Sequence, residues 1–342
     1  MAQAQAGEGS ASFDVVEAMI LANGWAGRGH IERFKPIAKD GKQLLRALVD
    51  GNIAPPEAIA QFDLLLHLQR QLSTYTILKK LGAGGMGTVY LAMQQETGRE
   101  VALKVISARL AGDNEFLNRF HRETQALIGL SHPHLANIIE SGSTGQTHYL
   151  AMDCVKGPSL AAMLKEYRAL PEDYVLRTMR QVAECLQYVS TTAGLVHRDI
   201  KPENILIQRE EGVSDLFPES DSAKLIDFGL VKNANDDEHL TQTGMTIGTP
   251  LYMSPEQVRG EKLDCRSDIY GLGATIYHLL TGSPPFKGSS PGAIMSAHLT
   301  DPVPDPGDLV PSLSQATRRM VMMSMAKKVD DRYLSLDAMI KA

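Results

Sequence analysis

The spacing of hydrophobic residues changes along this 342-residue chain and divides it into three parts. In residues 1–73, apolar positions recur every three to four residues over 15–21, over 43–49 and, most strongly, over 58–72. This period predicts amphipathic helices. Pro55 and Pro56 precede the last of them, and proline is tolerated in the first turn of a helix. We therefore expect residues 1–73 to form a helical N-terminal extension.

The pattern becomes β-like from residue 75. Alternating or β-branched runs at 75–78, 88–92 and 100–106 predict strands, and from about residue 158 the pattern is mainly helical. Two short β-type runs, 205–207 and 224–226, interrupt the helical part, and the acidic stretch 208–222 between them indicates a surface insertion. The expected fold class is α+β, with a domain at 74–342 made of a small β-rich lobe (74–153) and a larger helical lobe (154–342).

Composition narrows the possible partners and compartment. The chain is 43% apolar and 22% charged, has a net charge of −6, and its lysines and arginines are scattered, which argues against nucleic acid as the main partner. Cys154, Cys185 and Cys265 are widely spaced without a C-x-x-C pair, so we expect a reducing, cytoplasmic location. The N-terminus lacks the basic and apolar regions of a signal peptide.

No stretch of the sequence predicts a membrane span. The longest nearly uncharged run, 269–286, is interrupted by glycines and prolines, so we interpret it as a buried helix followed by a loop. The chain stops just after an amphipathic stretch typical of a domain's last helix, which fits a piece cut from a longer protein.

A glycine-rich motif follows the first predicted strand. Residues 82–89 read G-A-G-G-M-G-T-V and match G-x-G-x-x-G-x-V, in which glycine lets the backbone approach phosphate groups. Dinucleotide-binding loops of the Rossmann type share this spacing, but there the motif opens a helix. Here the motif runs into the β-like residues 88–92, which argues against a Rossmann dinucleotide-binding loop.

A second motif carries the candidate chemistry. Residues 197–204 read H-R-D-I-K-P-E-N, and residues 227–229 read D-F-G. Asp199 can accept a proton from a hydroxyl group, while Asn204 and Asp227 offer the oxygen ligands that Mg²⁺ prefers. The order H-R-D, N, D-F-G, together with the glycine motif and Val101-Ala102-Leu103-Lys104, resembles the protein kinases.

This resemblance implies a role for each motif residue. Asp199 would be the catalytic base, Lys201 would neutralise charge on the transferring phosphoryl group, and Lys104 would contact the α- and β-phosphates while paired with Glu123. Glu115 is the competing choice for that glutamate, but Phe120, Leu127 and Leu130 place Glu123 on the inward face of its helix. Asn204 and Asp227 would hold Mg²⁺ or Mn²⁺. The residues implied to line the ATP site are Gly82, Ala83, Gly84, Gly85, Gly87, Val89, Ala102, Lys104, Met152 (as the gatekeeper), Asp153, Val155 and Leu206.

Further motifs are similar to those of bacterial, eukaryotic-like (Hanks-type) Ser/Thr kinases. The lysine at 201, directly after Asp-Ile, is typical of Ser/Thr kinases. Ser254-Pro255-Glu256 takes the place of the family's A-P-E motif, and Glu256 is expected to pair with Arg332. Asp268 would brace the backbone of the catalytic loop. Thr241 and Thr243, and then Thr246, are the expected phosphorylation sites in the activation loop, where a phosphate would dock on Arg198. The alternative is that these threonines only keep the loop soluble.

The resemblance therefore predicts an ATP-dependent protein Ser/Thr kinase, activated by autophosphorylation, whose partners are protein substrates with Ser or Thr hydroxyls. The alternative is a nucleotide-binding pseudokinase that acts as a scaffold. For residues 1–73, two hypotheses stand side by side. One is a docking or regulatory module, which could also mediate self-association; the other is a passive extension that covers apolar kinase surface.

Overall fold

The computed structural model describes residues 12–210, 212–228 and 250–342, which fall into two compact units. The first unit holds the chain up to Asn114 together with Ile139–Cys154. The second holds Glu115–Ile138 and Val155–Ala342. The N-terminal helices and most of the β-rich region therefore belong to the same unit.

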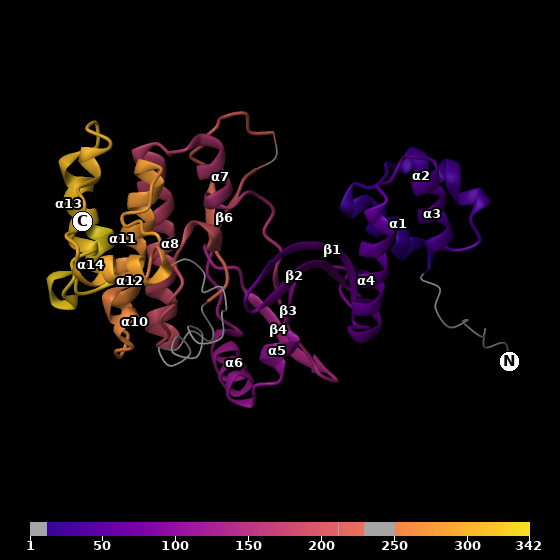
Figure 1. Cartoon of the computed structure of the whole chain (residues 1–342), viewed down its shortest axis with the longest axis horizontal. Coiled ribbons are helices and arrows are strands. Elements are labelled where there is room, and N and C mark those ends of the chain that lie inside the picture. Colours follow the sequence, from indigo (N-terminus) through magenta and orange to yellow (C-terminus); the bar gives the residue numbers. More distant parts are fainter. Residues whose placement is uncertain (1–11, 211, 229–249) are drawn as a thin grey trace. The chain divides into compact units, whose positions relative to one another are not determined.

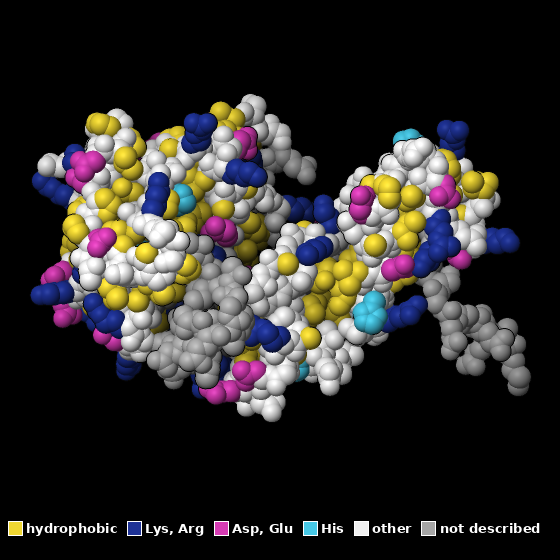
Figure 2. Space-filling model, viewed as in Figure 1, with side chains coloured by type: hydrophobic (Ala, Val, Ile, Leu, Met, Phe, Trp, Pro, Cys, Tyr) yellow, Lys and Arg dark blue, Asp and Glu magenta, His cyan; other side chains and the backbone are white. Residues whose placement is uncertain are grey.

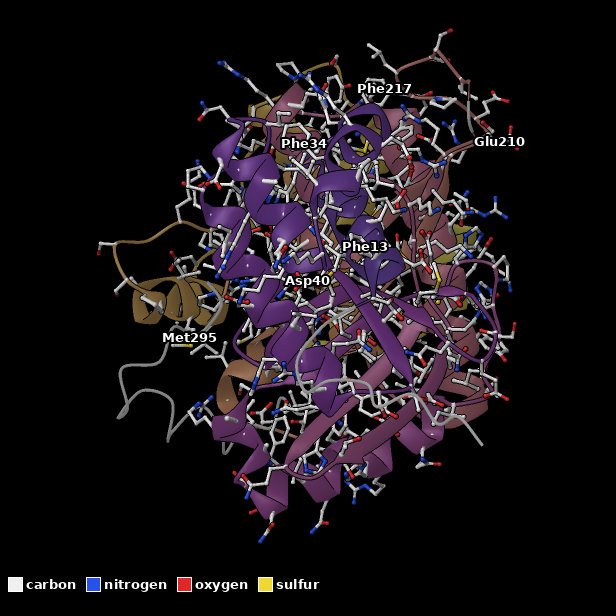
Figure 3. The ribbon with its side chains drawn as sticks, turned by 90° about the vertical axis from the view of Figure 1, so that its right-hand side faces the viewer. Phe13, Phe34, Asp40, Glu210, Phe217 and Met295 are labelled. Carbon is white, nitrogen blue, oxygen red and sulfur yellow. The ribbon has the colours of Figure 1, made fainter. Side chains whose placement is uncertain are left out.

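The chain begins with a helical module (Figure 1). Its elements are α1 (Phe13–Asn23), α2 (Arg28–Phe34), the 3-10 helix η1 (Lys35–Ile37), α3 (Gly41–Asp50) and α4 (Glu57–Gln71). At the start of α3, the Asp40 carboxylate accepts a hydrogen bond from the Gln43 backbone N–H at 2.8 Å, which caps the helix. Figure 3 labels Phe13, Phe34 and Asp40 in this module. The three helices predicted from apolar spacing are confirmed as α1, α3 and α4.

A five-stranded sheet follows the module in the order β1-β2-β3-β5-β4. The strands are β1 (Tyr75–Gly84), β2 (Gly87–Gln94), β3 (Glu100–Ile106), β4 (Ile138–Thr144) and β5 (Thr147–Asp153), with the short helix α5 (Ala108–Ala111) after β3. Strand β1 is antiparallel to β2, and its register shifts between Ile77 and Lys79 and again between Lys80 and Gly82. The three strands predicted in this region are confirmed.

One hydrophobic core joins the helical module to the sheet. Phe62, Leu65 and Leu68 of α4 are buried in the same cluster as Tyr75 and Tyr90 of the first two strands. The expected boundary between residues 73 and 74 lies between α4 and β1, and apolar side chains on both sides of it share this core. Separating the module from the sheet would therefore expose apolar surface on both.

The second unit is mainly helical. Its elements are α6 (from Asn114 to Leu127), α7 (Leu160–Tyr167), α8 (Glu172–Ala193), η2 (Pro202–Asn204), β6 (Ile205–Gln208), β7 (Ser222–Leu225), α10 (Pro255–Arg259), α11 (Cys265–Thr281), α12 (Pro291–Thr300), η3 (Pro306–Asp308), α13 (Gln315–Ser324), η4 (Val329–Asp331) and α14 (Leu336–Lys341). Helices α8 and α11 lie side by side (Figure 1). Almost every residue of α11 is buried, and the helix ends at Gly282, as expected for a buried helix followed by a loop.

The connection between β6 and β7 is tied to the helical core. Asp221 is 4% exposed and accepts hydrogen bonds from the Arg209 guanidinium and from the Tyr174 hydroxyl at 2.8 Å. Phe217, labelled in Figure 3, lies against the rings of Tyr167 and Tyr174. The predicted insertion is therefore present, and its ends are anchored. Within the described ranges, no helix is both long enough and apolar enough to cross a membrane.

Candidate active site

The glycine-rich motif forms a tight hairpin. Strand β1 ends at Gly84, β2 begins at Gly87, and these two glycines are register partners across a two-residue turn. A Cβ atom at Gly87, where φ is 158°, would lie 2.0 Å from the Val105 carbonyl oxygen, so only glycine fits there. Because the motif lies in a hairpin and opens no helix, the dinucleotide-loop alternative is excluded.

The other glycines of the hairpin leave space beside the backbone. A Cβ built at Gly82, Gly84 or Gly85 would meet no atom of the described residues within 4 Å. Such room is what a loop needs if its backbone is to approach a phosphate chain closely. At these three positions the backbone is therefore open to a ligand.

The candidate nucleotide residues of the first unit lie on one face of the sheet. Lys104 on β3 is opposite Val89 on β2, and Ala102 is opposite Met152 on β5. Since alternate residues of a strand share a face, the side chains of these four residues point the same way. Lys104 is only 7% exposed, and Met152 is 5% exposed. Asp153, at the end of β5, forms an ion pair with Arg99.

The catalytic-loop residues of the second unit contact one another directly. The Asp199 carboxylate accepts a hydrogen bond from Lys201 Nζ at 2.8 Å and another from Asn204 Nδ2 at 3.0 Å. Asn204 Nδ2 also donates to the Asp199 carbonyl oxygen at 2.9 Å. Both amide protons of Asn204 are thus directed at Asp199, and its amide oxygen remains as the group that can bind a cation. A hard oxygen donor at this place fits Mg²⁺.

A buried carboxylate fixes the backbone of this loop. Asp268 on α11 accepts hydrogen bonds from the backbone N–H groups of His197 and Arg198, at 2.8 and 2.9 Å. Burial raises the pKa of Asp268 to about 6, and the two backbone donors oppose that rise. The bracing contact predicted for Asp268 is confirmed.

Gln257 is a second support that the sequence analysis missed. Its side chain donates to the Arg198 carbonyl oxygen at 2.9 Å and also closes a capping box with Ser254 at the start of α10. The S-x-x-Q spacing at 254–257 was a readable sign of a helix start. It gave no sign of the bond to the catalytic loop, which lies 59 residues away in sequence.

Two residues of the site have strained backbones. Arg198 has φ 66° and Asp227 has φ 53°, values that non-glycine residues seldom adopt. Such strain persists only where the surroundings hold it, and it concentrates at functional sites. Asp268 holds Arg198 by accepting a hydrogen bond from its backbone N–H. Next to Asp227, the Ile226 carbonyl oxygen lies 3.2 Å from His197 Nε2.

His197 links the catalytic loop to the segment around Asp227. Its Nδ1 accepts a hydrogen bond from the Asp199 backbone N–H at 3.3 Å, so Nε2 carries the proton donated to Ile226. The ring of Phe228 lies 4.5 Å from the His197 ring, centroid to centroid. The H-R-D and D-F-G motifs are therefore packed on each other within this unit.

Glu123 of α6 faces Arg198. The two side chains lie 3.5 Å apart, and the Glu123 side chain is 14% exposed. Burial raises the pKa of Glu123, and the positive charge of Arg198 opposes that rise. The competing Glu115 is 84% exposed, so the inward orientation predicted for Glu123 is confirmed. Its pairing with Lys104 stays a prediction.

The ion pair expected between Glu256 and Arg332 is confirmed. Two hydrogen bonds of 2.7 and 2.8 Å join the side chains, which are 3% and 0% exposed. The Ser267 hydroxyl also donates to the Glu256 carboxylate at 2.6 Å. This pair ties α10, which carries Gln257, to the segment before α14.

The remaining predicted residues divide into two sets. Leu206 lies on β6 opposite Lys224, and Val155 is partly exposed at the start of the long C-terminal part of the second unit. Thr241, Thr243 and Thr246 lie outside the described residues.

A glycine hairpin beside a buried lysine, and a braced Asp-Asn loop packed on D-F-G, define the protein kinase class. Comparison with known families agrees: the protein kinase domain family matches residues 75–339. The chain therefore belongs to the protein kinase family, and residues before 75 lie outside the match.

Its relatives include bacterial Ser/Thr kinases. The serine/threonine-protein kinase PknF of Mycobacterium tuberculosis is 39% identical over 263 residues, which cover 76% of this chain and 53% of that protein. Pkn1 of Myxococcus xanthus is 37% identical over 267 residues, covering 78% of this chain and 37% of Pkn1. The chain thus spans about half or less of the length of these curated relatives. The expected resemblance to bacterial Hanks-type Ser/Thr kinases is confirmed.

Solved structures support the same fold. The kinase domain of M. tuberculosis PknI superposes with a TM-score of 0.62 at 29% identity, covering 79% of this chain and 96% of that one. Rad53, solved in complex with AMP-PNP, gives a TM-score of 0.64 at 24% identity over 82% of this chain and 68% of that one. At that identity the second match speaks for the fold alone. The α+β kinase fold expected from the sequence is confirmed.

Proposed function

We propose that the chain is an ATP-dependent protein kinase that transfers the γ-phosphoryl group of ATP to Ser or Thr hydroxyls. The observation that carries this proposal is the Asp199 carboxylate, held by Lys201 and Asn204 on a loop whose backbone is bonded to Asp268. A base fixed in this way can orient a hydroxyl group and accept its proton, which is the work that phosphoryl transfer to an alcohol requires.

Each neighbouring residue has a part in this reaction. Lys201 would place positive charge where the transferring phosphoryl oxygens develop negative charge. Asn204 and Asp227 would hold Mg²⁺, which would supply positive charge to neutralise the nucleotide phosphates. Lys104, paired with Glu123, would hold the α- and β-phosphates beneath the glycine hairpin.

The rest of the nucleotide would be bound by apolar side chains and backbone groups. Val89, Ala102 and Leu206 would enclose the adenine, and Met152 would border it. The backbone of Asp153 and Val155 would form hydrogen bonds with its edge. The pseudokinase alternative has no support from the geometry, because the lysine, the base and both metal ligands are present at their motif positions.

The activation loop is the proposed site of regulation. Phosphate on Thr241, Thr243 or Thr246 would add about −2 charge and would be attracted to Arg198. Arg198 already lies beside Glu123, so a phosphate at this site would act on a residue next to the catalytic base. Protein substrates and a cytoplasmic location are part of the proposal. On the face drawn in Figure 2, lysines and arginines are scattered among acidic and uncharged groups, which does not favour a nucleic-acid partner.

The test is incubation of the purified chain with Mg²⁺ and γ-labelled ATP, followed by mapping of phosphosites by mass spectrometry. We expect label on Thr241 or Thr243, and loss of most label in a variant with both threonines changed to alanine. Label that persists in the double variant at positions other than Thr246 would contradict the choice of sites but not the activity. Absence of any label in the wild-type chain, with a generic protein substrate present, would contradict the activity itself.

A further inference from the structure

Strand β1, one of the two edge strands of the five-stranded sheet, leads into the glycine hairpin, and along its outer edge the described residues supply no neighbouring strand. Backbone groups along such an edge need other partners. Here two amide side chains from the N-terminal helices supply them. Gln69 of α4 donates to the Tyr75 carbonyl oxygen at 2.5 Å and accepts from the Ile77 N–H at 2.7 Å. This side chain therefore bonds to β1 as a strand would.

Asn23, the last residue of α1, continues this role. Its Nδ2 donates at 2.8 Å to the Met19 carbonyl oxygen of its own helix and at 2.8 Å to the Leu78 carbonyl oxygen of β1. The register of β1 against β2 shifts between Ile77 and Lys79, so Leu78 is skipped in the pairing. Both protons of the amide are used, one to fix the side chain on α1 and one to hold the bulge.

The bulge lies four residues before Gly82 along the same strand. A β-bulge bends and twists its strand, and where it lies decides how the following residues are aimed. Asn23 and Gln69 hold the strand from Tyr75 to Leu78, before it shifts register a second time between Lys80 and Gly82 and enters the glycine hairpin. The two residues lie outside the residues matched by the kinase family, which begin at Tyr75.

We propose that Asn23 and Gln69 are positioning residues for the nucleotide: the N-terminal helices hold β1 so that the glycine hairpin closes correctly over the ATP phosphates. This inference rests on the proposed kinase function. It gives residues 1–73 a definite task in ATP binding, beyond covering apolar surface of the sheet.

The test compares isosteric variants that remove these hydrogen bonds while keeping the volume of the side chain. Asn23→Leu and Gln69→Met each leave β1 backbone groups without a partner. We expect each to raise the KM for ATP and the Kd for a fluorescent ATP analogue with Mg²⁺ by about 3- to 10-fold, in line with a lost hydrogen bond. The kcat should stay within about twofold, and amide hydrogen exchange over residues 79–86 should quicken.

The matched control is Val16→Ala. Val16 is fully buried in α1 and packs beside Gly41 of α3, so this change weakens the core of the helical module but removes no hydrogen bond to β1. It should lower the melting temperature while leaving the nucleotide constants unchanged. Unchanged nucleotide constants in both isosteric variants, or an equal rise in Val16→Ala, would overturn the inference. The first result would leave the kinase activity intact, whereas a wild-type chain that binds no nucleotide would overturn the proposed function as well.

Discussion

The Glu123 carboxylate lies 3.5 Å from the guanidinium of Arg198, the residue next to the candidate catalytic base. The protein kinase resemblance assigns Glu123 to Lys104 and Arg198 to a phosphorylated threonine. Arg198 and Lys104 would therefore compete for an ion pair with the Glu123 carboxylate. A phosphate bound to Arg198 would leave Glu123 available for Lys104. Under the proposed function, the contact between Glu123 and Arg198 would couple phosphorylation of the activation loop to ATP binding.

Replacing Glu123 with glutamine should lower kcat/KM for ATP at least tenfold, because Lys104, proposed to bind the phosphates, would lose its proposed charged partner. Glu115→Gln is the matched control on the same helix. Its side chain is 84% exposed and lies 3.9 Å from Arg119, so activity should be unchanged. Steady-state kinetics on both variants checks this. A larger loss of kcat/KM in Glu115→Gln than in Glu123→Gln would identify Glu115 as the functional glutamate.

The buried Glu256–Arg332 pair should be a strong determinant of stability. Glu256→Gln would leave a fully buried guanidinium without its counter-charge, which costs about 3–5 kcal/mol of unfolding free energy. Glu261→Gln, on an exposed pair 3.9 Å from Arg259, should change stability by about 0.5 kcal/mol or less. Urea denaturation of the two variants measures the difference. Equal effects would show that the buried pair contributes no more than a surface pair.

The same carboxylate predicts a response to acid. Burial alone would raise the pKa of Glu256, but hydrogen bonds from Arg332 and Ser267 hold that pKa below its ordinary value. When the pKa of a carboxyl group is lower in the folded than in the unfolded state, the group stabilises the folded protein at pH above its unfolded-state pKa. This stabilisation is lost as pH falls through the folded-state pKa. The wild-type chain should therefore lose stability below about pH 4.5 more steeply than Glu256→Gln does. If the unfolding free energy of the two proteins fell equally with decreasing pH, Glu256 would not be the source of this acid sensitivity.

Asp268 predicts a different pH dependence, this time of activity. Its pKa is raised to about 6, so the carboxylate gains a proton as pH falls through that value, and a protonated carboxyl group accepts the two backbone hydrogen bonds of the catalytic loop less strongly. The kcat should fall as pH drops through about 6. The contribution of Asp268 to stability depends on pH in the opposite direction. A raised folded-state pKa stabilises the folded protein at pH below the unfolded-state pKa, and this stabilisation is lost as pH rises through about 6.

Asp268→Asn is the variant that checks this origin. It should have a lower kcat at neutral pH, because an amide presents only one acceptor oxygen to two N–H donors. It should also lack the decline centred near pH 6. If the wild-type chain and the variant share that decline, the titrating group is a different one.

The glycine hairpin allows stability and nucleotide binding to be separated. Gly87→Ala places a Cβ 2.0 Å from a backbone oxygen at a positive φ, so we expect a loss of about 2 kcal/mol or more in unfolding free energy. Gly84→Ala meets no described atom within 4 Å and should keep its stability while raising the KM for ATP severalfold. Thermal melts together with ATP titration kinetics measure both quantities. A melting temperature in Gly84→Ala as low as that of Gly87→Ala would contradict this division.

The sequence predicted most of the kinase because its residues act in short, ordered motifs. Sequence analysis could name the glycine-rich motif, the loop around Asp199, the Asp268 brace and the Glu256–Arg332 pair, since each has a typical residue at a typical spacing. Asn23 could not be identified in this way. An asparagine before Gly24 indicates the end of a helix, and its bond to Leu78, 55 residues further on, depends on how α1 packs on β1. Helix α2 has seven residues, too few for a clear apolar period.

The central claim is that Asp199 serves phosphoryl transfer, and transfer from γ-labelled ATP to a protein substrate with Mg²⁺ tests it most directly. The wild-type chain is compared with Asp199→Asn, which keeps the shape of the side chain but cannot accept a proton. We predict labelled Ser or Thr with the wild-type chain, and a rate lower by about 10²- to 10⁴-fold in the variant, with unchanged nucleotide affinity. Equal rates in the two proteins would contradict the account.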